Sequence, residues 1–522
     1  MRRPIAPGAV AALLVLVVLI GGAAAVEMLI PAAPRGDQPL VGQGPVAAGT
    51  WYCPVTADLG ESALLTVAAV GRAPSTVILT RYKDRKAVED PPVVVAGGEA
   101  LEVRLGTEDA VEPIAVRWQG GAAVAHWRVG GIAGIGGDQG DSAAASCEPR
   151  PSQTWYLTGF DTTAKSRATL HLFNPYREDA VARLRFSTPK GPVNLVIADN
   201  QLVPAGTSAR IDLSDFQPEQ PDLGVVVQAL TGRLVVQGQV KIEGGTGGRA
   251  LLRGAPTPAL EWAVAQMRSS ESSSAWLSVQ NPSDREAAVE VRVSDPRGDI
   301  APLGETSVPA GGLVRIDLSE ASSQPDFGLA VTSLNEIPVV VSAFWTVVND
   351  KGRGLAASLA APGSSTEWAL AGGGTAGRSG VVSIYNPGVE DATVTVLGPK
   401  GRLREWSGLV VSPNRRVSVD LAAAGLDVAA IPVRVVSDRP VVTELSSLDP
   451  GEAPHLWAGV GVPAVDWTGP GTRPAVRLDP SLATTPVQAP PPPTPPDLLS
   501  PADLEPPPPA GPPPDPNTGG GD

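Results

Sequence analysis

The sequence has few of the residues that build metal centres and disulfide frameworks. It contains 2 cysteines and 3 histidines in 522 residues. Two cysteines are too few for the dense cross-links of a small secreted scaffold. The histidines, His126, His171 and His455, lie far apart and lack the spacing of zinc ligands. We therefore expect no metal site and no other cofactor.

Positive charge is also scarce. The chain has 40 Lys and Arg against 54 Asp and Glu, which gives a formal net charge of −14. Its basic residues are scattered and form no stripe along the sequence. Binding to a phosphate backbone requires such a stripe, so nucleic acid is excluded as the expected partner.

Sequence motifs of catalytic and nucleotide-binding sites are missing as well. The segment "GRSGV" at 377–381 fails the G-x-S-x-G pattern, and the glycine-rich stretches at 130–141 and 243–249 carry no Walker lysine. The sequence also names no pair of carboxylates for glycoside cleavage. We expect a protein that is not an enzyme. A hydrolase with a site assembled at a junction between repeats is an alternative.

A single long uncharged segment occurs near the amino terminus, at 4–26, directly after two arginines. Positive charge followed by an apolar run directs export and leaves the amino terminus in the cytoplasm. We prefer a single-pass signal anchor at 1–27, followed by a linker at 28–47. A cleaved signal peptide with an A-x-A site at 23–25 is the alternative, which would give a secreted protein.

The two cysteines, Cys53 and Cys147, are expected to form a disulfide, because an exported chain meets an oxidising compartment. Closing a loop of this size stabilises a fold by about 4–5 kcal/mol in the chain-entropy model. Two buried free thiols are the alternative. The predicted location is extracytoplasmic.

Internal repeats organise the rest of the chain. Three markers recur with a period of roughly 105 residues, which is typical of tandem domains of immunoglobulin size. The markers are a tryptophan (Trp51, Trp155, Trp262, Trp368 and Trp467), an Asn-Pro pair (Asn174-Pro175, Asn281-Pro282 and Asn386-Pro387), and a turn followed by a strand that ends in aspartate (Asp212, Asp317 and Asp420).

Each repeat consists of short runs of alternating apolar and polar residues, separated by Gly, Pro and Asn. Seven or eight short strands in such a length predict an all-β fold of tandem immunoglobulin-like antiparallel β-sandwiches. The strands expected in the third repeat are 262–267, 275–280, 287–294, 302–307, 312–318, 328–333, 337–346 and 355–360. The four sandwich repeats are expected at 48–150 (divergent, with the disulfide), 151–258, 259–364 and 365–470.

The marker residues are predicted to serve turns and the interior rather than chemistry. Proline has no N–H for the sheet, and the asparagine before it can hydrogen-bond the turn backbone through its side chain. Each recurring aspartate is expected to cap the connection that follows it. The periodic tryptophans are expected to pack in the repeat cores or at their junctions.

Tryptophans outside this period, Trp276, Trp345, Trp406 and Trp457, are the better candidates for exposure. Trp406 lies in the polar stretch "GRLREWSG" and is our candidate for a glycan-binding platform. The carboxyl-terminal segment, 471–522, is predicted to be a disordered proline-rich tail, because it cannot bury a core. A spacer and a ligand for a proline-recognising partner are its two possible roles.

Together, the exported amino terminus, the "WYCP" opening at 51–54 and the Asn-Pro strand units resemble a known family. It consists of actinobacterial secreted or membrane-anchored proteins classified as a domain of unknown function, DUF5719. The resemblance covers roughly residues 50–467 and implies an envelope location without an assigned activity or catalytic residues.

We therefore expect a non-enzymatic protein of the cell envelope that acts as a scaffold, spacer or protein-interaction module. Its expected partners are the membrane, through the N-terminal segment, and an envelope protein or cell-wall glycan. A glycan-binding protein with exposed tryptophan is the first alternative.

Overall fold

The chain is described here from a computed structural model. The structure describes residues 47–464, except 55–60, 107–111, 131–141, 244–247, 295–301, 351, 372–379, 400, 425, 427–431 and 448–455. The predicted anchor, His455, Trp467 and the proline-rich tail lie outside these residues. No helix in the described part is long and apolar enough to cross a membrane.

The described residues form antiparallel sheets, joined by turns and two short 3-10 helices, η1 (Val196–Ala198) and η2 (Leu213–Asp215). The expectation of an all-β fold is confirmed. Successive sheets share a core in pairs, and we call these pairs the first (β1–β9), second (β10–β18), third (β19–β26) and fourth (β27–β34) sandwich.

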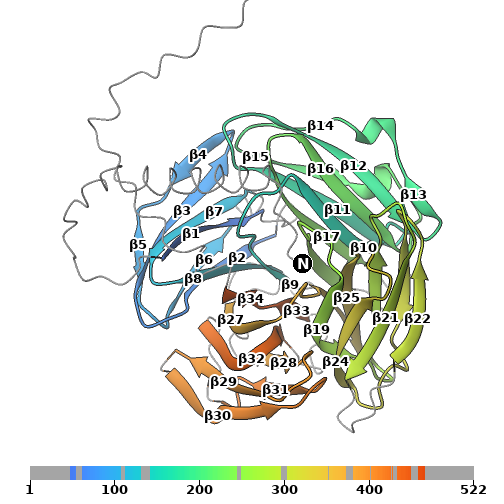
Figure 1. Cartoon of the computed structure of the whole chain (residues 1–522). Helices are drawn as coiled ribbons and strands as arrows, with labels where there is room; N and C mark the ends of the chain where they lie inside the picture. Colours follow the sequence, from blue (N-terminus) through green and yellow to red (C-terminus); the bar gives the residue numbers. More distant parts are fainter. Residues whose placement is uncertain are drawn as a thin grey trace, which may run out of the picture. The chain divides into compact units, whose positions relative to one another are not determined.

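In the first sandwich, one sheet has the order β1-β7-β3-β4 with β5 also on β3, and the other has the order β6-β2-β8-β9 (Figure 1). Its strands are β1 (Ala47–Cys53), β2 (Ala63–Ala69), β3 (Ser75–Lys83), β4 (Lys86–Glu89), β5 (Val93–Val95), β6 (Ala100–Leu105), β7 (Ile114–Gly120), β8 (Ala123–Val129) and β9 (Ala143–Ser146).

The second sandwich repeats this plan, with sheets β10-β16-β12-β13 (β14 also on β12) and β15-β11-β17-β18. Its strands are β10 (Thr154–Phe160), β11 (Ser166–Asn174), β12 (Ala180–Thr188), β13 (Gly191–Val193), β14 (Gln201–Val203), β15 (Thr207–Asp212), β16 (Leu223–Thr231), β17 (Val235–Ile242) and β18 (Gly248–Arg253).

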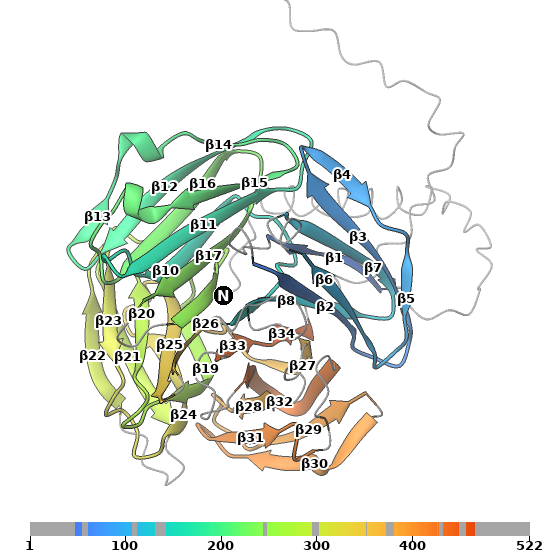
Figure 2. The ribbon, with the colours of Figure 1, turned by 180° about the vertical axis from the view of Figure 1, so that it is seen from behind.

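The third sandwich has the sheets β19-β24-β21-β22 and β23-β20-β25-β26 (Figure 2). Its strands are β19 (Glu261–Arg268), β20 (Ala275–Gln280), β21 (Ala287–Ser294), β22 (Pro302–Val308), β23 (Leu313–Asp317), β24 (Asp326–Ser333), β25 (Val340–Asn349) and β26 (Gly352–Leu359). All eight strands expected in this repeat are confirmed, with small shifts at their ends.

The fourth sandwich joins its two sheets through one long strand, which pairs with β27 and β29 in its first half and with β28 and β33 in its second. Its strands are β27 (Ser365–Ala371), β28 (Gly380–Tyr385), β29 (Ala392–Gly398), β30 (Gly401–Val411), β31 (Arg416–Asp420), β32 (Pro432–Ser447), β33 (Trp457–Val460) and β34 (Val462–Pro463).

A buried tryptophan ties the two sheets of every sandwich together. Each lies on the first strand of its sandwich. Its indole N–H reaches the carbonyl of the first residue of β8, of the residue directly before β17 or β25, or of a residue within β32. The donors are Trp51, Trp155, Trp262 and Trp368, and the acceptors are the carbonyls of Ala123, Leu234, Val339 and Val441, at 2.7, 2.8, 2.8 and 2.7 Å. Burial of the indole and a satisfied N–H together explain why tryptophan marks the repeat.

The Asn-Pro marker forms a strand-ending turn held by its asparagine side chain. In the third sandwich, the Asn281 amide donates to the carbonyls of Arg285 and Val308, at 2.7 and 3.1 Å, and its Oδ1 accepts from the Ser283 N–H at 3.0 Å. Asn174 and Asn386 make the equivalent three bonds. The asparagine side chain therefore holds its own turn and also the end of a second strand, which is β22 in the third sandwich.

The recurring aspartates also have the predicted role. Oδ1 of Asp212, Asp317 and Asp420 accepts the backbone N–H two residues later, at 3.1, 2.8 and 2.9 Å. The pKa of Asp317 is lowered mainly because the Ser319 hydroxyl donates to the same oxygen at 2.6 Å, and secondly because of this backbone hydrogen bond. The aspartates therefore start the connections that follow their strands.

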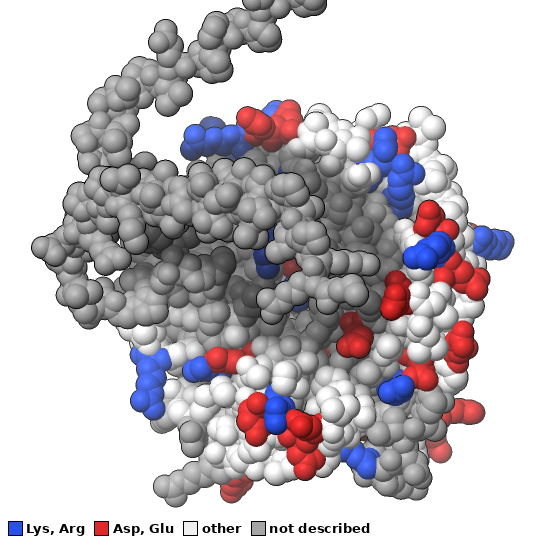
Figure 3. Space-filling view, viewed as in Figure 1, with Lys and Arg blue, Asp and Glu red and all other residues white. Residues whose placement is uncertain are grey.

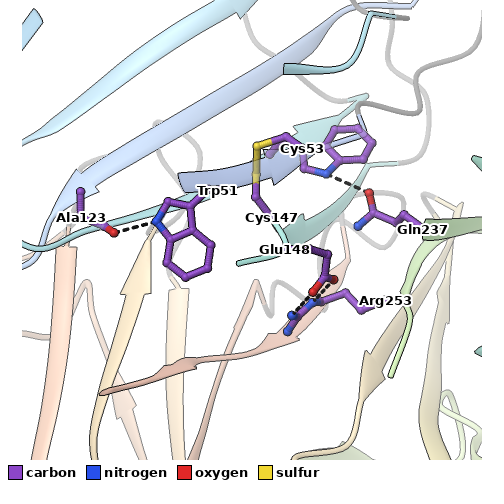
Figure 4. The surroundings of a disulfide bond; sticks show 8 residues. Trp51, Cys53, Ala123, Cys147, Glu148, Gln237 and Arg253 are labelled. Carbon is purple, nitrogen blue, oxygen red and sulfur yellow. Dashed lines mark hydrogen bonds and ion pairs between the residues drawn. A yellow bond between two sulfur atoms is a disulfide. The ribbon is translucent and has the colours of Figure 1, made fainter. Parts of the chain in front are cut away.

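The two cysteines form the predicted disulfide (Figure 4). Cys53 ends β1 and Cys147 follows β9, so the bond links the two sheets of the first sandwich across 94 positions of sequence. Both residues are fully buried beside Trp51 in the core. This sandwich lacks the Asn-Pro turn of the other three. Its two sheets are held by the disulfide as well as by the tryptophan.

The four sandwiches contact one another in cyclic order. Strand β9 contacts β18, β18 contacts β26, β26 contacts β33, and β33 contacts β9. The first and fourth sandwiches also meet where Gly98, at φ 81°, lies against the Pro399 carbonyl. A Cβ at this position would approach that oxygen to 2.5 Å. All the described residues therefore belong to one structural unit.

We predict that Asn281→Ala lowers the free energy of unfolding by roughly 2–3 kcal/mol, because the buried Val308 carbonyl and the turn backbone lose their partners. Denaturant unfolding of the purified protein measures the change. Asp284→Ala, an exposed substitution in the same turn, is the control and should cost no more than about 0.5 kcal/mol. Equal effects of the two substitutions would show that the side chain does not hold the turn.

Candidate functional site

Polar side chains are buried where each sandwich meets its neighbour. They occupy the same place in each sandwich, as a cross-strand pair on the face that points away from its own core. The pairs are Thr66 with His126, His171 with Gln237, Ser278 with Ser342, and Ser383 with Glu444. All eight residues are buried. His171 alternates with Leu170 and Leu172, which places it on the outer face of β11, yet it is only 5% exposed.

Between the second and third sandwiches, the pair contacts a buried carboxyl group. The Ser278 hydroxyl donates to Asp222 at 2.8 Å, and Thr158 lies 2.7 Å from the same hydroxyl. Burial raises the pKa of Asp222 from its usual 3.8 to about 7, although the Ser278 hydrogen bond and the nearby Arg315 oppose the rise. The carboxyl group is therefore close to half-protonated at neutral pH.

Between the third and fourth sandwiches, Glu444 has the corresponding role. Its carboxylate accepts the Gln266 N–H at 2.6 Å and the Ser358 hydroxyl at 2.7 Å. The Gln266 side-chain oxygen in turn accepts from Ser383 and Arg416, at 2.7 and 2.6 Å. Burial raises the pKa of Glu444 to about 7.

Two largely buried ion pairs and one indole contribute to the junction between the first and second sandwiches. Arg249 is bidentate on Glu61, and Arg253 is bidentate on Glu148, at 2.9 and 2.8 Å. Figure 4 shows the second pair beside the disulfide, since Glu148 directly follows Cys147. Trp127 donates its N–H to Gln237 at 3.1 Å. These contacts attach the first sandwich, which contains the disulfide, to the second sandwich.

Enclosure of the junction carboxyl groups argues against a catalytic role. Asp222 is 4% exposed and Glu444 is 0% exposed, and both are hydrogen-bonded to neighbouring sandwiches. A catalytic carboxyl group has to reach the proton that it transfers. These groups hold sandwiches together instead.

An open groove lies at the outer edge of the junction between the first and second sandwiches. It has a volume of about 760 Å³, which is large enough for several sugar units or a short peptide. One wall is the outer face of β1, β3, β4 and β7, and the other is formed by the turns at 175–177 and 205–206. We call it the tyrosine groove.

Three of the 5 tyrosines in the chain line this groove. Tyr82 packs edge-on against Phe173, with ring centroids 4.9 Å apart, and Tyr52 lies 6.4 Å from the same ring. Burial raises the pKa of Tyr52 to about 12, with smaller effects from Tyr176 and Tyr82. Tyr176 is 45% exposed. Burial also raises the pKa of Tyr82. The groove therefore presents aromatic surface, and the hydroxyl groups of Tyr52 and Tyr82 stay protonated at neutral pH.

The groove is more basic than the chain as a whole. Four of its lining residues are basic (Arg85, Lys86, Arg117 and Arg177), and one is acidic (Glu89). Arg117 pairs with Glu89 at 3.1 Å, and Arg85 pairs with Asp179 of the second sandwich at 2.9 Å. Basic and acidic side chains are otherwise interspersed on the face shown in Figure 3. A net positive groove on an acidic protein favours an anionic ligand.

The corresponding groove between the third and fourth sandwiches is much smaller. It lies against the Pro387 turn as the tyrosine groove lies against Pro175, but its volume is about 170 Å³. Ala263, which follows Trp262, occupies the place of Tyr52, which follows Trp51. The large volume and the tyrosine lining are therefore not shared by these two junctions.

The tryptophans expected to be exposed lie elsewhere. Trp276 and Trp345 are 7% and 1% exposed, so the expectation of exposure was wrong for both, because neighbouring sheets cover them. Trp406 lies on β30, is half-buried and packs against the core of the fourth sandwich. No group of three potential metal ligands occurs among the described residues.

The tyrosines were missed by sequence reasoning, although one signal was present. The residue after Asn-Pro is Tyr176 in the second repeat, but Ser283 and Gly388 in the third and fourth. A bulky aromatic residue at the tip of a turn that otherwise carries small residues makes this turn a candidate for binding, because binding residues are often placed on loops.

Two comparisons with known proteins bear on this chain. A family model described as "Family of unknown function (DUF5719)" matches residues 103–346 and 328–445. No curated protein matches the chain.

We predict that Asp222→Asn weakens the pH dependence of stability. The folded carboxyl group binds its proton more tightly than the unfolded one, so its contribution is complete below the unfolded pKa of 3.8 and is lost as pH rises through about 7. Between about pH 5 and pH 8, the wild type should lose roughly 2–3 kcal/mol more than the variant. Denaturant unfolding at both pH values measures this, with exposed Asp215→Asn as the control. The same pH profile for both variants would contradict it.

Proposed function

The chain belongs to DUF5719, a family of unknown function, and on that premise we propose that it is a non-enzymatic, extracytoplasmic protein of the cell envelope that holds a ligand in its tyrosine groove. The observation that carries the proposal is the contrast between the buried polar contacts of the junctions and the large open tyrosine groove. Buried polar groups fix neighbouring sandwiches to each other, and the tyrosine groove offers aromatic and basic side chains to solvent.

An extracytoplasmic location is supported by the disulfide, because such bonds persist in oxidising compartments. In this proposal, residues 1–27 are a signal anchor that crosses the membrane once and leaves the carboxyl terminus outside. The apolar run after two arginines supports it. A cleaved signal peptide would place the same sandwiches outside the cell without the anchor.

We further propose four immunoglobulin-like domains at 48–150, 151–258, 259–364 and 365–470. The strand order that recurs in the first three sandwiches supports this division, as does the recurrence of the tryptophan and asparagine bonds. Domains joined by buried contacts act as one scaffold rather than as a flexible string. Such a scaffold holds its groove in a fixed orientation relative to the other sandwiches.

Capture from the envelope of the source cells tests the function. We expect the wild-type protein to retain one or more envelope components, and the double variant Lys86→Glu/Arg177→Glu to lose them, because both exposed cations line the groove. Lys190→Glu, an exposed charge reversal outside the groove lining, is the matched control. Retention of the same components by all three proteins would exclude the groove as the binding site. Hydrolysis of an envelope polymer by the wild type would contradict a non-enzymatic role.

A further inference from the structure

The tyrosine groove has the chemistry of a site for proline-rich sequence. Proline-rich segments dock on grooves lined by aromatic side chains, because proline rings pack flat against them and the polyproline II conformation is already populated. A polyproline II segment has no internal hydrogen bonds, so its carbonyls accept bonds from a receptor. Tyr52, Tyr82 and Tyr176 supply aromatic surface, and the hydroxyl groups of Tyr52 and Tyr176 are the candidate donors, since that of Tyr82 donates to the Pro175 carbonyl at 3.5 Å.

The basic residues of the groove restrict the ligand further. Lys86 and Arg177 are exposed on opposite walls, one on β4 and one in the turn after β11. A peptide lying between them would meet positive charge on both sides. Acidic residues interspersed among prolines would therefore bind better than a neutral or basic proline-rich sequence.

The chain itself contains a sequence of this chemistry. Residues 485–522 read "TPVQAPPPPTPPDLLSPADLEPPPPAGPPPDPNTGGGD", and no Lys or Arg follows Arg477. Carboxylates are spaced between the proline runs, at Asp497, Asp503, Glu505 and Asp515. Proline content and charge sign both match the groove.

We propose that the tyrosine groove binds the acidic proline-rich sequence of residues 485–522 from a second copy of the chain. The inference rests on the proposed function, because it names the ligand of the same groove. Its consequence is head-to-tail association of copies outside the cell, in which each groove holds the tail of a neighbour. Heterologous contacts of this kind do not saturate at a dimer unless they close into a ring.

An acidic glycan is the competing ligand, because sugar rings also stack on tyrosine and their carboxylates also pair with arginine. The chain's own sequence favours the peptide, because every copy of the protein carries a tail with matching proline and acidic residues. The concentration of this ligand therefore equals the concentration of the protein itself. The glycan is therefore included in the experiment as a separate arm.

The test is titration of a fluorescently labelled synthetic peptide of residues 488–516 into the full-length chain, followed by anisotropy. We expect saturable binding that weakens as salt increases, because the contacts are partly ionic. A second peptide with its four acidic residues replaced by amides should bind less tightly and show little salt dependence. The tail of each protein molecule competes with the labelled peptide for the groove, so the wild type and the variants are compared at equal chain concentrations.

Two groove variants separate the aromatic from the ionic contribution. Tyr176→Ala removes an exposed ring without opening the core, and should weaken binding roughly three- to tenfold. Lys86→Glu/Arg177→Glu should weaken it by roughly tenfold or more at low salt, and by less at high salt. Lys190→Glu is the matched control and should bind as the wild type does.

The outcomes are distinct. Peptide binding that both groove variants weaken, and that the control does not, supports the proposal. Absence of saturable binding, or equal weakening by Lys190→Glu and the double variant, overturns it. If a soluble polyuronic acid binds in a groove-dependent manner and the peptide does not, the peptide proposal is overturned while the proposed binding function stands. If neither ligand binds and envelope capture does not depend on the groove, both proposals fail.

Discussion

Polar groups enclosed between neighbouring sandwiches must find hydrogen-bond partners, and the association of the four sandwiches depends on this constraint. An unsatisfied polar group costs about 1–3 kcal/mol when buried, so a junction with mismatched partners would open. The first–second, second–third and third–fourth junctions meet the constraint with different residues. Asp222 accepts from Ser278, Glu444 from Gln266 and Ser358, and Gln237 from Trp127.

This variation explains how four similar sandwiches keep a fixed order. Apolar faces alone are interchangeable, because alanine and valine surfaces pack against many partners. A buried carboxyl group beside a matching hydroxyl is specific, because any other neighbour leaves it unpaired. The ion pairs of Arg249 and Arg253 give the junction between the first and second sandwiches the same selectivity.

Much of each sandwich could be predicted from sequence. Alternation located the strands, and the side-chain chemistry of Asn281 and Asp317 located the turns, because these features depend on residues close in the chain. The junctions could not be predicted in this way. Alternation places His171 on an outer face but cannot say that a different sandwich covers that face. The same limit hid Trp276, Trp345 and the tyrosines of the groove, whose surroundings come from distant sequence.

The contact between β9 and β33 restricts the evolution of repeat number in this chain. An open row of domains can gain or lose one copy at its end, since each copy meets only its neighbours. Here the last sandwich meets the first, and Gly98 lies directly against the Pro399 carbonyl. Adding or deleting a copy would separate those two surfaces and expose both. New properties are therefore expected to evolve by substitutions within the four existing sandwiches rather than by a change in their number.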